Sequence, residues 1–341
     1  MTEKENLMRV VNGEEPAWLP RKGQSQFDDD PENHKPCCQN AMPVYFPPRR
    51  GAKGGRIDVF GVEYEPTDST SGQELPMPNN FILDDITKWR DIIKTPSLEG
   101  IDWETVAKKS IENIDRNETA VGMGTNGGYF QHLMNFMGFS EGLVALHEDP
   151  EEVLALYEYL AEYYETIALN LVDYIKPDFY GITDDTATAQ NPFMSPEMYR
   201  RLVKPFQARL AKIATDRDIT IEMHCCGRCE DFIDDWIEFG VKFWNPAQTM
   251  NDLVGIKEKY GNSFVLNGCW DSSGPPGWPG AKEDIVRQAV RDCVDTFAPG
   301  GGFCFRAPVY GAKGDERARE HSFWVTDEYN KYGRTFYQRQ G

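Results

Sequence analysis

The stretch ITIEMHCCGRCEDF, residues 219–232, decides the expected fold because its side chains separate onto two faces. Side chains alternate along a strand, so every second residue faces the same way. One face would hold Ile219, Ile221, Met223 and Cys225. The other would hold Thr220, Glu222, His224 and Cys226. An apolar face turned towards helices and a polar face turned inward are typical of a strand in an α/β barrel.

The chain around this stretch alternates between helical and strand patterns from about residue 100 onward. The apolar spacing predicts a helix over 153–175, and Ser195 followed by Pro196 predicts the start of a helix over 195–214. Further helices are predicted at 231–240, 251–261 and 283–297, between strands at 177–185, 219–226, 241–248, 264–271 and 301–308. Strands separated by helices are parallel and joined by right-handed crossovers.

We therefore predict an α/β fold, a (β/α)8 TIM barrel, with an open doubly wound sheet as the second choice. The segment GMGTNGG at 122–128 does not have the spacing of a nucleotide-binding loop, which argues against the open sheet. Residues 1–95 are irregular and poor in apolar residues. We expect them to form an N-terminal extension or cap over a single barrel domain spanning 1–341.

Composition excludes several classes of function. A formal net charge of -19 and a pI near 4.7 disfavour binding to a phosphate backbone, so nucleic acid is not expected as a partner. There is no run of 18 apolar residues, and MTEKENLMRVVNGEEP lacks the apolar centre of a signal peptide. We expect a cytoplasmic protein with no membrane partner. Eight cysteines are too few for a disulfide scaffold of this size.

The residues that end the predicted strands should meet at one mouth, because chemistry in parallel α/β folds lies at the carboxyl ends of the strands. Asp184 and Asp185 are candidate catalytic residues, as general acid or base or as partners of a metal-bound histidine. The alternative for one of them is a structural bond to backbone amides. His132, among aromatic and methionine side chains, is interpreted as a core histidine.

Three inward side chains suggest a metal site. His224, Cys226 and Cys304 offer one nitrogen and two sulfur atoms, which are donors that Zn²⁺ prefers. Three protein ligands leave a fourth position for water or substrate, as in catalytic zinc sites. Cys225 and Cys229 compete for this role, and a site made of Cys226, Cys229 and Cys304 would be structural instead.

The same residues carry a resemblance to a known family. The strand end MHCCG, the stretch DDTATAQNPFMSPEMYRRLVKPF, the opening TEKENLMRVVNGEEP and the late GGFC resemble the uroporphyrinogen decarboxylase superfamily. The likeness is nearest to its zinc-dependent, corrinoid-linked methyltransferases. It covers the chain from about residue 95 together with the first 20 residues. The resemblance implies an α/β barrel in which His224, Cys226 and Cys304 bind zinc.

The resemblance also implies an activity. Such methyltransferases move a methyl group between a small substrate and the corrinoid (cobalamin) of a separate corrinoid-binding protein, in either direction. The predicted substrate-binding residues are Phe130, Tyr180, Trp244, Asn245 and Arg306. The aromatic residues Tyr129, Phe130, Phe136, Tyr180 and Trp244 favour O-demethylation of a methoxylated aromatic compound, with Asp184 or Asp185 as the proton source.

Two other functions stay open at this point. One is a porphyrinogen decarboxylase that needs no metal. It fits less well because a paired-arginine segment is replaced by Arg21 and Lys22 among acidic residues, and a G-H-G motif is replaced by LNGCWDSSG. The other is a non-catalytic barrel with a structural metal site that only binds partners. Zinc content would separate the methyltransferase from the decarboxylase, and methyl transfer to cob(I)alamin would separate it from the non-catalytic barrel.

Overall fold

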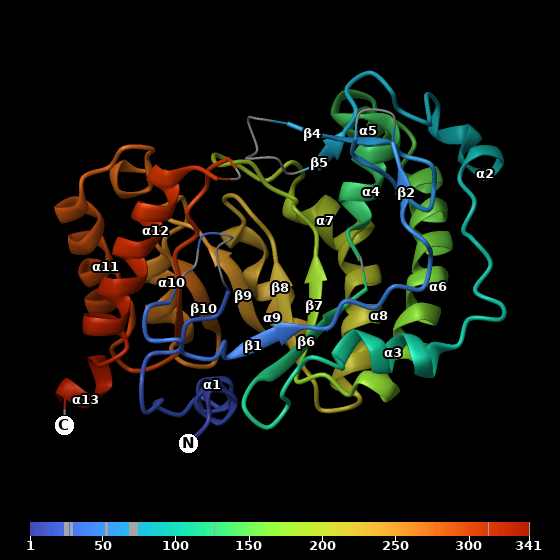
Figure 1. Cartoon of the computed structure of the whole chain (residues 1–341). Coiled ribbons are helices and arrows are strands. Elements are labelled where there is room, and N and C mark those ends of the chain that lie inside the picture. Colours follow the sequence, from blue (N-terminus) through green and yellow to red (C-terminus); the bar gives the residue numbers. More distant parts are fainter. Residues whose placement is uncertain are drawn as a thin grey trace.

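The chain folds around one curled parallel sheet in a computed structural model that describes residues 1–23, 27, 30–51, 54–67, 74–125, 127–312 and 314–340 (Figure 1). Within the described residues this sheet has seven strands in the order β1-β6-β7-β8-β9-β10-β11, all paired in parallel. The strands are β1 (Cys38–Asn40), β6 (Ala120–Gly124), β7 (Phe179–Thr183), β8 (Thr220–His224), β9 (Val241–Ala247), β10 (Val265–Cys269) and β11 (Phe303–Arg306). The predicted α/β TIM-barrel fold is confirmed.

The gap between the two edge strands β11 and β1 is bridged by residues 20–22. Arg21 forms a parallel bridge with Phe305 of β11, and the amide of Lys22 donates to the Phe305 carbonyl at 3.2 Å. On the other side, the Cys37 thiol donates to the Arg21 carbonyl at 3.0 Å, immediately before β1 begins. This short segment therefore takes the position of the eighth strand of the barrel.

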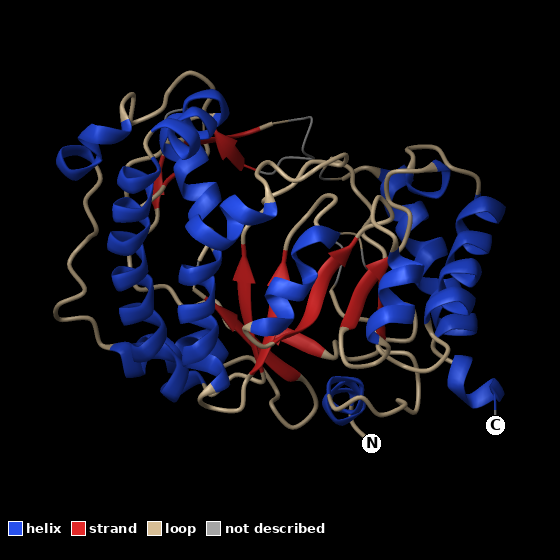
Figure 2. Ribbon diagram, turned by 180° about the vertical axis from the view of Figure 1, so that it is seen from behind, coloured by secondary structure: helices blue, strands red, loops and turns tan. Residues whose placement is uncertain are grey.

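Helices cover the outside of the sheet, as the view from behind shows (Figure 2). They are α3 (Trp103–Ile111), α4 (Tyr129–Met137), α5 (Phe139–Glu148), α6 (Pro150–Ile175), α7 (Pro196–Leu202), α8 (Lys204–Thr215), α9 (Ile233–Glu238), α10 (Leu253–Tyr260), α11 (Glu283–Phe297), α12 (Glu316–Glu328) and α13 (Phe336–Gln340). There are also short 3-10 helices, η2 (Ile86–Lys88), η3 (Glu230–Phe232) and η4 (Pro275–Gly277), and a π-helix, η5 (Tyr329–Gly333).

The region before residue 95 contributes to both ends of the barrel. Helix α1 (Glu3–Val11) begins with a capping box between Thr2 and Glu5 and lies below the strands, at their amino ends (Figure 1). Two short antiparallel pairs lie at the opposite end, together with helix α2. They are formed by β2 (Arg49–Arg50), β3 (Arg56–Ile57), β4 (Tyr64–Pro66) and β5 (Glu74–Pro76), and α2 spans Trp89–Ile92. The same region also supplies β1 and residues 20–22 to the barrel.

One predicted helix is divided in two. Ser195 caps its start as expected, accepting a hydrogen bond from the Met198 amide at 3.1 Å. The helical pattern over 195–214 is interrupted at Val203, after which α8 begins with Pro205 in its first turn. Proline has no amide hydrogen to donate to the carbonyl four residues earlier, which explains the break at this point.

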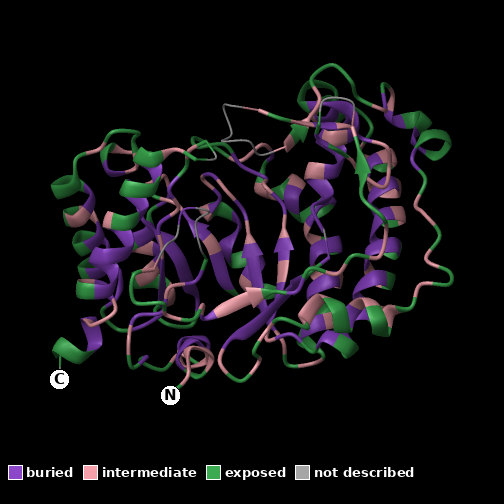
Figure 3. Ribbon diagram, in the orientation of Figure 1, coloured by how far each residue is buried: buried purple, intermediate pink, exposed green. Residues whose placement is uncertain are grey.

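The two faces predicted for residues 219–226 are found: Ile221, Met223 and Cys225 lie in the main apolar core, whereas Glu222 and His224 face the interior of the barrel. The first three residues are buried on the side that faces the helices. The strands are mostly buried, whereas many exposed residues lie on the outer helices (Figure 3). Burying a side chain such as Ile221 contributes about 1.5–3 kcal/mol. The opposite faces of the strands point into the barrel, whose interior has a polar upper part and an apolar lower part.

The lower part of the interior is a separate apolar cluster that rests on helix α1. Its buried members are Leu7, Val10, Val11, Cys37, Ala120, Phe179, Phe243, Val265 and Cys304. Ala120, Phe179 and Val265 are each the first residue of their strand, so this cluster closes the amino end of the barrel. The carboxyl end, called the mouth below, is left for polar side chains.

Candidate active site

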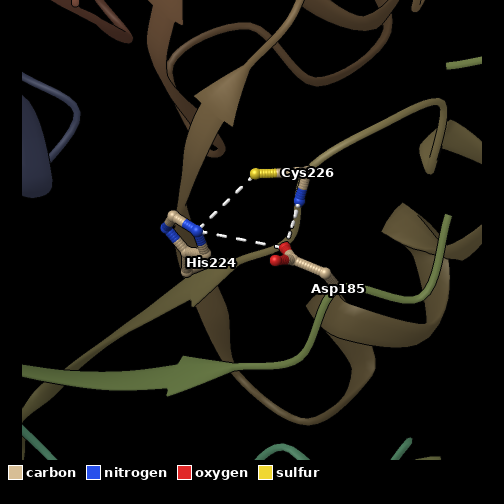
Figure 4. A group of neighbouring side chains, drawn as sticks. All are labelled: Asp185, His224 and Cys226. Atoms are coloured by element: carbon tan, nitrogen blue, oxygen red, sulfur yellow. Dashed lines mark hydrogen bonds and ion pairs between the residues drawn. The ribbon is translucent and has the colours of Figure 1, made fainter. Parts of the chain in front are cut away.

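Asp185, His224 and Cys226 meet at the mouth, beside the carboxyl end of β8 (Figure 4). The His224 Nε2 atom lies 3.7 Å from the Cys226 Sγ atom and 3.9 Å from the Asp185 Oδ1 atom. The side chains of His224 and Asp185 are 32% and 34% exposed, so a ligand in the mouth can reach them. We call these three residues the mouth cluster.

The donor atoms of the mouth cluster suit one zinc ion. In a tetrahedral zinc site with Zn–N of about 2.0–2.1 Å and Zn–S of about 2.3 Å, neighbouring ligand atoms lie about 3.4–3.6 Å apart. The observed separations of 3.7 Å and 3.9 Å are within a few tenths of an ångström of that range. Nitrogen, sulfur and carboxylate oxygen are all known zinc donors, and three of them leave one position open.

Backbone geometry holds two of these residues together. The Cys226 amide donates to the Asp185 Oδ1 atom at 2.7 Å, and the Gln131 side-chain amide of α4 donates to Oδ2 at 3.1 Å. Gly227 then turns the chain at a φ of 94°, where a Cβ atom would lie 2.6 Å from the carbonyl oxygens of Ala187 and Thr188. The glycine of the HCCG motif is therefore required by this close approach.

A chain of hydrogen bonds behind His224 fixes which of its nitrogens carries hydrogen. The Asn245 Nδ2 atom donates to the Glu222 Oε1 atom at 2.6 Å. Because a carboxylate only accepts, the amide nitrogen must face Glu222, and the amide oxygen then lies 2.8 Å from the His224 Nδ1 atom. Nδ1 therefore carries the hydrogen, and the lone pair of Nε2 points towards Asp185 and Cys226.

Glu222 is in turn neutralised by Lys22, whose Nζ atom donates to both carboxylate oxygens at 2.6 and 2.5 Å. The two side chains are only 9% and 11% exposed. Burial by itself lowers the pKa of Lys22, but attraction to Glu222 outweighs it and places that pKa above its ordinary value. The interior of the barrel thus contains a fully paired ion pair that orients Asn245 and, through it, His224.

Asp184 has a different environment from its neighbour. It is 1% exposed and accepts hydrogen bonds from the amides of Phe130 and Gln131 at the start of α4 and from the Gln207 side chain. Burial is the largest influence and raises the pKa of Asp184 to about 7. Asp184 therefore holds α4 against the strand end, whereas Asp185 faces the mouth.

The mouth contains a cavity of about 380 Å³ next to the mouth cluster. Its lining is mostly polar and glycine-rich: Lys22, Gly23, Asn40, Ala41, Met42, Gly122, Met123, Gly124, Phe179, Gly181, Thr183, Glu222, His224, Asn245, Asn267 and Arg306. A Cβ atom at Gly124 would lie 2.6 Å from the Gly181 carbonyl oxygen, so this wall has no room for a side chain. Among the described residues, no carboxylate lies within ion-pair distance of the Arg306 guanidinium, which is thus a cationic group in the cavity.

The structure places Asn245 and Arg306 in this cavity, as the sequence predicted, but not the aromatic residues. Trp244 is fully buried on the outer face of β9, where its indole donates to the Cys225 carbonyl and packs on Trp236. Tyr180 and Phe130 are also fully buried, the first hydrogen-bonded to Thr125 and the second stacked on Phe193. These three positions are corrected: strand alternation turns Trp244 and Tyr180 away from the interior, and Phe130 packs in the core.

Cys304 is inward-facing but lies apart from the mouth cluster. It is fully buried in the lower cluster with Phe179 and Phe243, and in the described residues the group that could hold a metal contains Asp185 in its place. The strands of a barrel are tilted, so residues in the same hydrogen-bond register on strands far apart lie at different heights. Alternation predicts which way Cys304 points, but it does not predict this height.

The two competing cysteines also lie outside the mouth cluster. Cys225 and Cys229 are fully buried, and the Cys229 thiol donates to the Cys225 carbonyl at 3.6 Å. Sequence reasoning gave no role to Lys22 or Gln131 in the site. Nothing near Lys22 in the sequence points to Glu222, which is 200 residues away. The alternation of β8 did place Glu222 on the same face as His224.

Comparison with known proteins identifies the family. The family model for uroporphyrinogen decarboxylase (URO-D) matches residues 68–309, which is more than half of the chain. The chain therefore belongs to the uroporphyrinogen decarboxylase family, and the predictions of this superfamily and of an enzyme are confirmed. No sequence among the curated proteins matches it.

One solved structure supports the same fold. A methyltransferase from Methanosarcina mazei is similar with a TM-score of 0.63 and 15% identity, over 97% of this chain and 99% of that chain. A sugar phosphate isomerase/epimerase from Parabacteroides distasonis has a TM-score of 0.33 and 11% identity, over 70% and 81% of the two chains.

No helix of the described residues is long and apolar enough to cross a membrane.

Proposed function

We propose that this protein is a zinc-dependent methyltransferase that moves a methyl group between a small substrate and the corrinoid of a partner protein in the cytoplasm. The mouth cluster is the observation that carries the proposal, because nitrogen, sulfur and oxygen donors converge beside an open cavity. Membership of the family and the fold shared with a methyltransferase are consistent with it. The proposed ligands are Asp185, His224 and Cys226.

The reaction needs a group that makes a methyl-bearing heteroatom a better leaving group. Bound zinc would supply a Lewis acid for that heteroatom, or would hold a thiol acceptor as its thiolate. The chain's own residues do the rest. Asn245 keeps the Nε2 lone pair of His224 directed at the site, and the apolar lower cluster closes the far end of the barrel to water.

Arg306 and the amide groups of the cavity would bind the substrate. Arg306 is the cationic group in the lining without a carboxylate partner among the described residues, and the Asn40 and Asn267 amides lie in the same lining. A small polar substrate with an anionic group suits such a surface. The methoxylated aromatic donor expected earlier loses its support, because the aromatic residues that favoured it do not line this cavity.

Matched cysteine variants test the proposal. Purified protein should contain about one zinc per chain and should transfer a methyl group to cob(I)alamin on a corrinoid protein. Cys226→Ser should lose zinc and activity, because a serine hydroxyl is a poor zinc ligand at neutral pH. Cys304→Ser is the control for a second inward cysteine and should keep its zinc.

Three outcomes would count against this assignment. Zinc-free protein with full decarboxylase activity on a porphyrinogen would favour the activity for which the family is named. Loss of zinc from Cys304→Ser, with retention in Asp185→Asn, would return the ligand set to His224, Cys226 and Cys304. Stoichiometric zinc with no methyl transfer to any corrinoid protein would point to a structural metal site.

A further inference from the structure

A second cavity, of about 410 Å³, lies outside the barrel mouth. It is lined by residues of the segment that carries β2, β3 and β4 and of helices α4 and α6, and the labelled elements β2, α4 and α6 lie together at one end of the molecule (Figure 1). Of the residues that the structure describes, none lines both this cavity and the mouth cavity. We call it the aromatic pocket, because Tyr45, Phe46, Phe60, His132, Tyr163 and Tyr164 line it.

The rings of the aromatic pocket hold one another in place. Phe60 meets His132 edge-on, with ring centres 5.5 Å apart and an angle of 77°, and meets Tyr163 at 6.2 Å and 68°. His132 stacks on Tyr164 at 5.4 Å, and the Tyr164 hydroxyl is hydrogen-bonded to its Nε2 atom at 2.7 Å. Edge-to-face and stacked rings attract one another, so these side chains form a pocket that exists before a ligand binds.

The opening of the pocket is formed by surfaces that remain only partly covered. Tyr45 and Phe46 are half-buried and lie edge-on at 5.2 Å, and Pro47 and Pro48 next to them are exposed. Rigid aromatic and proline side chains lose little conformational freedom when a ligand covers them. A flat ring could therefore enter against Phe60 and be covered by Tyr45 and Phe46.

The charged groups of the pocket leave one cation without an acidic partner. Asp58 is occupied within its own turn by the amides of Phe60 and Val62 and by the Tyr64 hydroxyl. Arg56 is paired with Glu74 at 2.8 Å. Arg49 makes one long hydrogen bond, at 3.4 Å, to the Asp58 carbonyl, and no carboxylate of the described chain lies within ion-pair distance of it.

We propose that the aromatic pocket binds a planar aromatic carboxylate, with the ring against Phe60 and the carboxylate paired with Arg49. An arginine guanidinium binds a carboxylate through two parallel hydrogen bonds. The proposal does not depend on the proposed reaction, because binding should occur with or without zinc in the mouth. Gln131, whose side chain holds Asp185, and His132 are consecutive residues of α4, but no described residue lines both cavities, so the pocket is distinct from the active site.

Titration calorimetry of the full chain with benzoate tests this site. Benzoate should bind with one molecule per chain, and cyclohexanecarboxylate, which has the charge without the flat ring, should bind about tenfold more weakly. Arg49→Gln should weaken benzoate binding by about tenfold or more while leaving the weak binding of benzyl alcohol unchanged. Phe60→Leu should weaken both benzoate and benzyl alcohol.

Arg306→Gln is the matched control, because it removes one arginine from the mouth and not from the pocket. It should leave benzoate affinity unchanged. The proposal is overturned if wild-type protein does not bind benzoate at millimolar concentration, or if Arg306→Gln abolishes binding while Arg49→Gln preserves it. Arg49 is exposed, so its replacement is not expected to prevent folding, and an unchanged melting temperature would verify this.

Discussion

The upper and lower halves of the barrel interior are built from the same inward faces of the same strands, yet they differ in chemistry. The upper half holds Lys22, Glu222, Asn245 and His224 in one hydrogen-bonded chain. The lower half holds Phe179, Phe243 and Cys304 in an apolar cluster on helix α1. Alternation along a strand determines whether a side chain points into the barrel. The position of the residue between the two ends of the barrel determines whether that side chain has polar or apolar surroundings.

The largest effect should come from leaving the upper half with an unpaired charge. Lys22→Met removes the cation that faces Glu222, and breaking a buried ion pair by removing one partner costs about 3–5 kcal/mol. Urea denaturation should show this loss in the free energy of unfolding. The double variant with Lys22→Met and Glu222→Leu should recover most of it, since both charges are gone. Equal destabilisation of the single and double variants would mean that the pair is not the cause.

The two neighbouring aspartates differ in environment: Asp185 faces the mouth, whereas Asp184 is buried outside it. This difference can be tested by titration. The pKa of Asp184 is about 7, above the usual 3.8, so folded protein keeps this proton where unfolded protein has released it. The free energy of unfolding should therefore fall as pH rises from about 4 to about 7, by on the order of 3 kcal/mol from this group.

Urea denaturation at pH 5 and pH 8 measures this dependence. Asp184→Asn should reduce the fall in stability between the two pH values, because it removes the titrating group. Asp185→Asn serves as the control: it removes a neighbouring charge that adds to the raised pKa of Asp184, but burial is the largest cause, so most of the wild-type difference should remain. The buried environment assigned to Asp184 would be contradicted by the same pH dependence in wild type and Asp184→Asn.

The smallest of these effects should come from breaking the hydrogen bonds between Glu222, Asn245 and His224 without removing a charge or a proposed zinc ligand. Asn245→Leu leaves His224 free to carry its hydrogen on either nitrogen. Changing a partner that orients a metal-bound histidine lowers metal affinity by about 10–100-fold. Zinc titration would measure this loss, and ¹⁵N NMR of the imidazole would report the hydrogen position without reference to activity. Asn267 also lines the mouth cavity, and Asn267→Leu should leave zinc affinity and the hydrogen position on His224 unchanged. Similar changes in the two variants would argue that Asn245 does not determine the tautomer of His224.

Much of this architecture could be predicted from the sequence. The alternation in residues 219–226 and the helix–strand rhythm after residue 100 predicted a parallel barrel and the inward side of His224 and Cys226, and both are found. Asn245 and Arg306 were predicted at the mouth and line its cavity. These features depend on local periodicity, which the sequence contains directly.

What the sequence could not provide depends on contacts between distant segments. Trp244 precedes Asn245 by one position, so the same alternation that turns one side chain inward turns the other outward, and aromatic character alone gave it the wrong side. Asp184 and Asp185 could not be told apart, because their difference arises from α4 and Gln207. The pairing of Lys22 with Glu222 could not be predicted, because the two residues meet only when residues 20–22 close the barrel.

The bridging segment at residues 20–22 has a consequence for biosynthesis. It is synthesised long before its pairing partner β11. The ring can therefore be completed only after β11 has been synthesised, and until residues 20–22 take their place Lys22 is not held against Glu222. Closure of the barrel is thus a late event in folding, and a chain stopped before Phe303 would lack the strand to which residues 20–22 pair.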